Sequence, residues 1–225
     1  MKYIKFIITL VVFLSVNGTL SLCAVSQENI DPVKMLRETS ERFNELRTYS
    51  CKATSIFKVY KGNRVKTHQD IVLYVFQKPM SIKMTWLKPW NIKGQVAVYS
   101  DEQLKVKLNW LPVWMPMNPD GNIAKDAAGN RIYQTDLGTL IGQVMEIIDH
   151  SEINYEGSAV SKDSREIMKV SLKSDDELVY VSIDKETGLP VTFEIYGPDM
   201  KLRQAAYFED LQINIPVSPY EFTVE

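Results

Sequence analysis

Residues 178–225 read LVYVSIDKETGLPVTFEIYGPDMKLRQAAYFEDLQINIPVSPYEFTVE, and this stretch decides the fold. It contains three runs rich in β-branched and aromatic residues, at 178–183, 191–196 and 205–213. Thr187-Gly188 and Gly197-Pro198-Asp199 separate these runs and are typical of turns. Runs this close in sequence favour antiparallel pairing, because a parallel crossover needs about a dozen residues or more. The stretch therefore predicts an antiparallel meander.

Two amphipathic helices are predicted upstream of the meander. Asp31 can cap a helix that has Pro32 at its first position, and apolar residues then recur at helical spacing as far as Arg47. A second helix starts at Asp136 and ends near His150. Its apolar stripe consists of Leu137, Leu140, Ile141, Val144 and Ile148.

The rest of the chain has the texture of strands. Residues 48–60 and 67–76 flank a turn signal at 61–64, which predicts a long hairpin. Further strands are expected at 80–87, 95–99 and 104–108, and again from Ile153 onward. Between 104 and 108, leucine and valine alternate with lysine, so one face of that strand is wet and the other buried.

The N-terminus has the pattern of a cleavable signal peptide over residues 1–26. Lys2 and Lys5 precede or flank an apolar run that is shorter than the roughly twenty residues needed to span a membrane. Ala24-Val25-Ser26 offers small residues for cleavage. We therefore predict export to the periplasm and one domain over residues 27–225. The alternative is a membrane-anchored lipoprotein, lipidated at Cys23, since Leu20-Ser21-Leu22-Cys23 is close to a lipobox.

Composition excludes several classes of function. The formal net charge is −2, with charges of both signs interspersed, which argues against a nucleic-acid partner. Nucleophile elbows, phosphate loops and metal-ligand spacings are absent from the sequence, so we expect no enzyme, no metal and no cofactor. Cys51 follows the predicted leader and is expected to be a buried, inert thiol.

The C-terminal stretch resembles the end of the LolA-like periplasmic lipoprotein carriers. The matching residues are Asp184, Thr187, Gly188, Leu189 and Pro190, then residues 208–211, Asn214, Pro216 and Phe222. The resemblance implies an α+β fold in which a strongly curved antiparallel sheet forms an unclosed half-barrel. Two helices would cover its concave face. The use that the family implies is sheltering acyl chains rather than catalysis.

The central region is similar to an uncharacterised, DUF1571-like bacterial group within that fold. The similar segments are Lys78-Pro79, residues 84–90, Val98-Tyr99, residues 118–121, residues 129–132 and Leu137-Gly138. In the carriers, a Lys/Arg-Arg-Pro turn near the cavity mouth supplies a functional arginine. Lys78 stands at the corresponding position here, where it would act at the mouth, but it lacks the planar fork of a guanidinium.

Tryptophan and methionine are concentrated between residues 84 and 117. Such side chains either fill a core or line a cavity for an apolar ligand, to which flexible methionine adapts well. Residues 110–117 contain two prolines, with a third at Pro119, and are not expected to form a regular strand. They, or the helix from Leu137, are predicted to be a lid. The predicted cavity and lid residues are Phe76, Met84, Trp86, Trp90, Tyr99, Trp110, Trp114, Met115, Met117, Leu140 and Val144.

These observations favour a monomeric, non-catalytic periplasmic protein that binds or carries a lipid or the acyl chains of a lipoprotein. It could hand its ligand to a membrane protein of the envelope. One alternative is an envelope-stress sensor or interaction domain of the same fold, with the tryptophans as a protein-binding hot spot. A second is an envelope-lipid hydrolase with Asp136 or Glu146 as the acid.

Overall fold

The computed structural model describes residues 30–62, 64–161, 163–218 and 220–223. The predicted signal peptide and Cys23 fall outside these ranges, so cleavage and lipidation stay predictions. Within the ranges, no helix has both the length and the apolar character needed to cross a bilayer.

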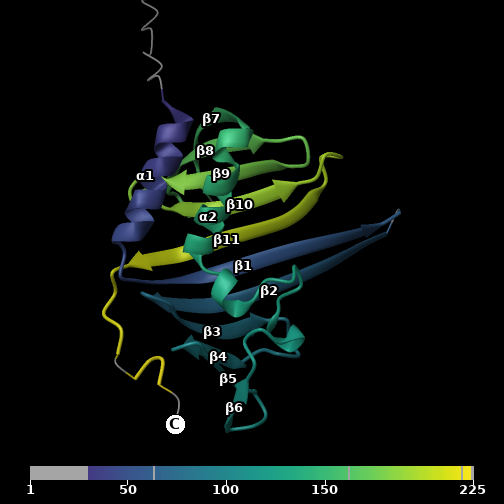
Figure 1. Cartoon of the computed structure of the whole chain (residues 1–225), viewed down its shortest axis with the longest axis vertical. Coiled ribbons are helices and arrows are strands. Elements are labelled where there is room, and N and C mark those ends of the chain that lie inside the picture. The colour runs from purple at the N-terminus through teal and green to yellow at the C-terminus, as the bar shows by residue number, and fades with distance from the viewer. Residues whose placement is uncertain (1–29, 63, 162, 219, 224–225) are drawn as a thin grey trace, which may run out of the picture.

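One antiparallel sheet runs through the described part of the chain (Figure 1). Its eleven strands are β1 (Thr48–Lys61), β2 (Arg64–Gln77), β3 (Ser81–Lys88), β4 (Val96–Ser100), β5 (Gln103–Lys107), β6 (Trp114–Met117), β7 (Glu152–Val160), β8 (Glu166–Lys173), β9 (Leu178–Asp184), β10 (Pro190–Tyr196) and β11 (Leu202–Ile213). Their spatial order is β6-β5-β4-β3-β2-β1-β11-β10-β9-β8-β7. The first and last strands therefore meet in the middle, and the edges are β6 and β7.

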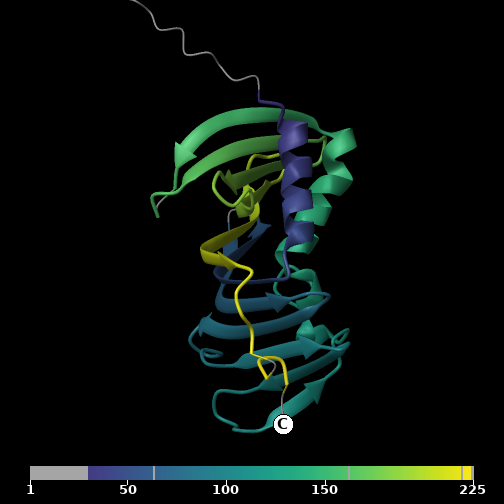
Figure 2. The same cartoon turned by 90° about the vertical axis from the view of Figure 1, so that its left-hand side faces the viewer.

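The sheet is curved and unclosed, and the helices lie on one side of it (Figure 2). They are α1 (Pro32–Glu45) and α2 (Leu137–Ile147), with short 3₁₀ turns η1 (Asn122–Ala124), η2 (Ile132–Gln134) and η3 (Ile148–His150). This confirms the predicted α+β half-barrel with two helices. The chain passes from edge β6 to edge β7 through η1, η2 and α2, so this connection crosses the sheet on the inner face.

Both helices begin where the sequence predicted. The carboxylate of Asp31 accepts hydrogen bonds from the backbone N–H groups of Val33 and Lys34, at 2.9 and 3.2 Å. Asp136 does the same for α2, accepting from Gly138 N at 2.7 Å. Each aspartate satisfies N–H groups that have no partner within the first turn of a helix.

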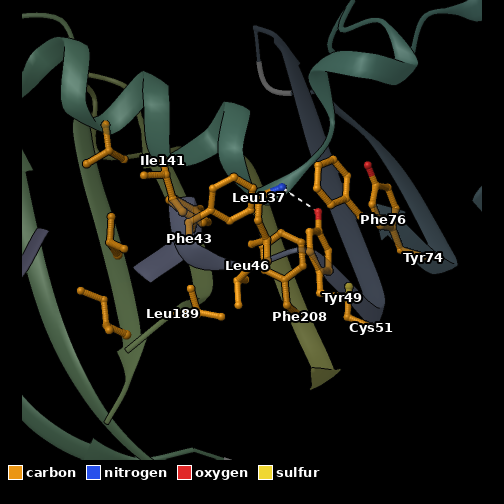
Figure 3. Close-up of a cluster of buried hydrophobic side chains, with 14 of the residues drawn as sticks. Phe43, Leu46, Tyr49, Cys51, Tyr74, Phe76, Leu137, Ile141, Leu189 and Phe208 are labelled. Atoms are coloured by element: carbon orange, nitrogen blue, oxygen red, sulfur yellow. Dashed lines mark hydrogen bonds between the residues drawn. The ribbon is translucent and has the colours of Figure 1, made fainter. Parts of the chain in front are cut away.

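The helices are fixed to the sheet around Tyr49 (Figure 3). The Tyr49 hydroxyl accepts a hydrogen bond from Leu137 N at 3.0 Å, and its ring stacks on Phe76 at 5.0 Å. Phe43 of α1 packs against both rings. Burial raises the pKa of Tyr49 well above its ordinary value of 10.0, so the hydroxyl stays protonated in this core.

The residues that carried the family resemblance have structural roles. Asp184 is buried and accepts hydrogen bonds from Glu186 N and Thr187 N, at 2.9 and 2.8 Å, which closes the β9–β10 turn. Gly188 has a φ of +68°, a conformation that favours glycine, and its backbone lies against the Arg42 side chain of α1. Leu189 is fully buried.

Asn214 joins the two chain-distant strands in the centre of the sheet. Its side-chain oxygen accepts a hydrogen bond from Arg47 N at 3.0 Å, and its backbone N–H donates to Thr48 O at 2.8 Å. The end of β11 is thereby tied to the start of β1.

One part of the secondary-structure prediction was wrong. Residues 114–117 form an edge strand, β6, in which Pro116 lies opposite Lys105 of β5. An edge strand tolerates proline because the outward side of the strand has no neighbour that needs an N–H donor. Pairing with β5 also fixes the faces: Met115 and Met117 lie opposite Val106 and Leu104 on the inner face, and Trp114 lies opposite Lys107 on the outer face.

Candidate functional site

A cavity of about 510 Å³ lies on the inner face of the sheet. Its floor comes from β1 to β6 and β11, and its roof from residues 118–136, the segment between β6 and α2, which we call the cover. The residues that line it are Ala53, Thr54, Ser55, Asp70, Val72, Tyr74, Met84, Trp86, Ile92, Gln95, Ala97, Leu104, Val106, Leu108, Met117, Ala124, Lys125, Asp126, Ala127, Asn130, Ile132, Gln134, Thr135, Leu140, Gln204, Ala206 and Phe208. This size is within the usual range for small-molecule sites.

Small side chains on the sheet make room for the cavity. Ala53, Ala97 and Ala206 stand on three different strands, and all three line it. Around them the floor consists mainly of aliphatic and sulfur-containing side chains, together with the Trp86 ring. The cavity is thus suited to an apolar ligand.

Polar groups are gathered toward the cover and the β1–β2 hairpin. Burial, and secondarily the charge of Asp126, raise the pKa of the Asp70 carboxyl above its ordinary value of 3.8. Asp126 itself accepts hydrogen bonds from Ala128 N and Asn130 N, at 2.9 and 2.8 Å, which shapes the turn of the cover. Burial also raises the pKa of Tyr74 well above 10.0, so its hydroxyl is neutral.

The cover is held by its own hydrogen bonds and by one aromatic contact to the sheet. The Tyr133 hydroxyl donates to Asp120 at 2.6 Å, and Arg131 forms an ion pair with the same carboxylate at 3.0 Å. The Tyr133 ring lies 5.3 Å from the ring of Tyr99 on β4. The carboxylate of Asp120 raises the pKa of Tyr133 through that hydrogen bond, which keeps the hydroxyl protonated as a donor.

Four of the predicted cavity residues line the cavity: Met84, Trp86, Met117 and Leu140. They come from β3, β6 and α2. These three elements are far apart in the sequence, and only the fold brings the four residues together around the cavity.

Other predicted residues belong to the core or to another face. Phe76, Tyr99 and Val144 are buried, at 2, 8 and 5% exposure, and do not line the cavity. Met115 is on the inner face of β6 but outside the lining, and Trp114 is on the outer face. A one-residue shift along a strand moves a side chain to the opposite face, which is why Trp114 and Met115 separate.

Trp90 and Trp110 are placed differently from the prediction. They are 86 and 72% exposed and lie in the β3–β4 and β5–β6 turns. The cover, and not the predicted residues 110–117, forms the roof of the cavity. The helix α2, which was the alternative prediction for the lid, contributes Leu140 to the cavity wall. Aromatic composition alone does not reveal burial, because a turn side chain has no neighbouring strand to cover it.

Lys78 caps the C-terminal end of α1 and does not lie at the mouth of the cavity. Its ammonium group donates hydrogen bonds to Phe43 O and Asn44 O, at 3.0 and 2.6 Å, and lies over the Phe43 ring. A cation there satisfies carbonyl groups that the last helical turn leaves without partners. Lys78 is not among the cavity-lining residues.

Sequence reasoning missed the cover and the alanines. The cover contains Asp126, Asn130 and two glycines, a composition typical of a solvated loop, so nothing marked it as a roof. The alanines did carry a signal: Ala97 and Ala206 occupy inward positions in strands where larger residues would fill a core.

The residues that were considered as catalytic groups have structural positions or lie on the surface. Asp136 is 3% exposed and its carboxylate caps α2. Glu146 is exposed on the same helix. Burial raises the pKa of Cys51 to about 12, so the thiol is held in its unreactive form. Among residues 30–223, where described, no group of three or more potential ligands is arranged for a metal ion.

No model of a protein family matches this chain, and no curated protein matches it. Solved structures do match. The lipoprotein LppX of Mycobacterium tuberculosis has a TM-score of 0.54 at 13% identity, over 83% of this chain and 96% of that one. A LolA superfamily protein from Nitrosomonas europaea has a TM-score of 0.39 at 11% identity, over 86% and 98%.

A chain of the Pseudomonas aeruginosa MucA/MucB complex has a TM-score of 0.49 at 12% identity. The alignment covers 87% of this chain but only 62% of that one. Identities this low are informative about the fold alone, and the similarity of the fold rests on the match to LppX. The half-barrel predicted from the sequence is confirmed at the level of the fold, which this chain shares with LppX.

Proposed function

We propose that this protein binds a lipid, or an acyl chain of a lipoprotein, in the 510 Å³ cavity and carries it within the cell envelope. The cavity under the cover is the observation that carries the proposal. Its floor is mainly apolar, and its polar side chains come from the roof, from the hairpin side and from Gln95 of the β3–β4 turn, which suits a ligand with a long apolar part and a polar end.

Burial of apolar surface provides the driving force. Each methylene group that leaves water for the cavity contributes about 0.8 kcal/mol. A chain that is only partly enclosed therefore gains enough to offset much of its removal from a membrane. Release then depends on a competing apolar site, because a protein without an energy source only moves its ligand downhill.

The proposed role is binding without catalysis. Asp136, the strongest candidate for an acid, spends its carboxylate on three hydrogen bonds to the start of α2, from Gly138 N and from Thr139 N and Oγ1. The signal-peptide pattern of residues 1–26 supports action in the periplasm or at a membrane facing it.

Trp86 offers a direct test, because it lines the cavity. We expect a brominated fatty acid to quench its fluorescence saturably in the purified, delipidated protein. Trp86→Phe should remove most of that quenching, and Trp110→Phe should leave it. Solvent extraction and mass spectrometry of the protein before delipidation should detect a co-purifying lipid.

A cavity-filling pair of variants provides the control. Ala206→Phe should weaken fatty-acid binding by at least about tenfold, because the ring occupies ligand space. Ala159→Phe makes the same change on the exposed part of β7 and should bind as the unmodified protein does. The proposal fails if no lipid co-purifies and quenching is neither saturable nor dependent on Trp86.

A further inference from the structure

Two adjacent turns at one end of the sheet expose large apolar side chains. Trp90 in the β3–β4 turn is 86% exposed, and Trp110 and Val113 in the β5–β6 turn are 72 and 51% exposed. We call residues 89–95 and 108–113 the rim. Two tryptophans left in water on neighbouring turns are unusual for a surface that has no partner, because each presents a large apolar area.

The rim is an ordered structure. Asn109 Nδ2 donates a hydrogen bond to Lys93 O at 3.1 Å, which joins the two turns. Within the first turn, Gly94 N donates to Trp86 O at 2.8 Å and Trp86 N donates to Gln95 O at 3.0 Å. The tryptophans are thus carried on turns that are bonded to each other and to a cavity residue.

The rim also belongs to the cavity. Ile92 and Leu108, one from each turn, line the cavity wall together with Gln95. Trp90 and Trp110 are two residues along the chain from Ile92 and Leu108, respectively. Whatever surface the tryptophans contact is therefore brought to this end of the cavity.

Basic side chains predominate around the rim, although Asp70, next to the Ile71–Lys88 pair, also lines the cavity. Residues 88–100 and 103–117 contain no aspartate or glutamate, whereas Lys88 and Lys93 are exposed and form no ion pair with any described residue. The β1–β2 hairpin extends past Lys88 at the same end of the sheet and adds the exposed Lys61, Arg64 and Lys66. The acidic β8–β9 turn, residues 174–177, belongs to the other half of the sheet.

We propose that the rim docks on an anionic lipid bilayer, inserting Trp90 and Trp110 at headgroup depth so that an acyl chain passes between the bilayer and the cavity. Tryptophan is favoured at a membrane–water interface because its ring is apolar and its N–H is polar. Lysine and arginine near it are attracted by anionic lipids, at about a fivefold gain in affinity for each charge. The passage of the chain rests on the proposed function, but the docking does not.

Vesicle binding tests the docking. The probe is phosphatidylethanolamine–phosphatidylglycerol vesicles in a co-sedimentation assay, with the purified protein in a Cys23→Ser background so that no acyl anchor contributes. We expect binding that weakens with salt and on replacing the anionic lipid by phosphatidylcholine. Trp90→Ala/Trp110→Ala should lower the apparent affinity by at least about tenfold. Lys88→Glu/Lys93→Glu should lower the apparent affinity for the vesicles more than added salt lowers that of the unmodified protein.

Tyr220→Ala is the matched control, since Tyr220 is a 79% exposed aromatic residue outside the rim. It should change vesicle binding by less than about twofold. Absence of binding by the unmodified protein overturns the proposal and leaves the rim to a protein partner. Equal binding by the double tryptophan variant overturns it as well.

The cavity assay separates the two proposals. Quenching of Trp86 by a brominated fatty acid in the absence of vesicles should persist in Trp90→Ala/Trp110→Ala, because neither side chain lines the cavity. If vesicles bind and the cavity does not, the proposed function fails while docking stands. If the cavity binds and vesicles do not, the docking proposal alone fails.

Discussion

The two halves of the sheet use the same inner face in opposite ways. In β8 to β10 this face is packed directly under the helices, and Val170, Leu172 and Val181 are at most 1% exposed. In β3 to β6 the inner face is roofed by the cover, and Met84, Trp86 and Val106 are only partly buried and face the cavity. We call these the filled half and the hollow half.

The difference comes from what lies over each half. Helices present a continuous apolar stripe, which fills the space over a sheet at the density of a core. The cover contains only short 3₁₀ turns and polar loops, so it closes over the strands without filling the space between. The lesson is that one sheet can supply both the stability and the binding site when its two halves have different roofs.

The largest effect that the comparison predicts is the loss of stability when a leucine is truncated to alanine. Leu172→Ala in the filled half should lower the free energy of unfolding by about 2–5 kcal/mol, because it leaves a new void in a packed core. Leu140→Ala, on the cavity wall over the hollow half, should cost about 1 kcal/mol or less, since it enlarges space that is already empty. Denaturant unfolding of both variants measures the difference, and equal costs would contradict the distinction between the halves.

Alanine substitutions at two glycines of α2 test how closely the helices are packed over the filled half. A methyl group on Gly138 would lie 2.4 Å from the Phe43 ring, whereas the same group on Gly142 would meet nothing within 4 Å. Gly138→Ala should therefore destabilise the protein by about 1–3 kcal/mol through overpacking. Gly142→Ala should stabilise it by up to about 1 kcal/mol through helix propensity. Thermal unfolding should show shifts of opposite sign; a shift in the same direction would mean that α1 and α2 are less closely packed.

The smallest effect concerns a carboxyl group on the cavity wall. The pKa of Asp70 is raised by burial, so the ionised carboxylate at neutral pH works against folding. That contribution favours the native state below the ordinary pKa of 3.8 and is lost as the pH rises through the raised value. Asp70→Asn should therefore gain stability relative to the unmodified protein between acidic and neutral pH. Denaturant unfolding as a function of pH measures this gain, and a pH-independent difference would contradict it.

The elements of the fold were predictable because their signals are local. Asp31 and Asp136 preceded apolar stripes at helical spacing, and both cap helices. Alternation between 104 and 108 predicted a strand with one buried face, and Leu104 is buried while the lysines are not. Closely spaced runs near the C-terminus predicted a meander, and β9 to β11 form one.

The site was predictable only in part because its location depends on long-range pairing. Trp114 and Met115 were equivalent by composition, and only the register of β6 against β5 sends one outward and the other inward. Trp90 and Trp110 looked like lining residues, yet their turns direct Ile92 and Leu108 to the cavity and leave both tryptophans exposed. Lys78 matched a functional position of the carriers, but its reach to the end of α1 depends on where that helix docks.

The pairing of β1 with β11 has a consequence for biosynthesis. One side of β1 (Thr48–Lys61) stays unpaired until β11 (Leu202–Ile213), far along the chain, has been made. An unpaired strand edge is a template for wrong association, so a nascent chain carries this hazard while the strands between β1 and β11 are made. Holding the chain unfolded until β11 is available would remove the hazard, and that is the service a general chaperone provides.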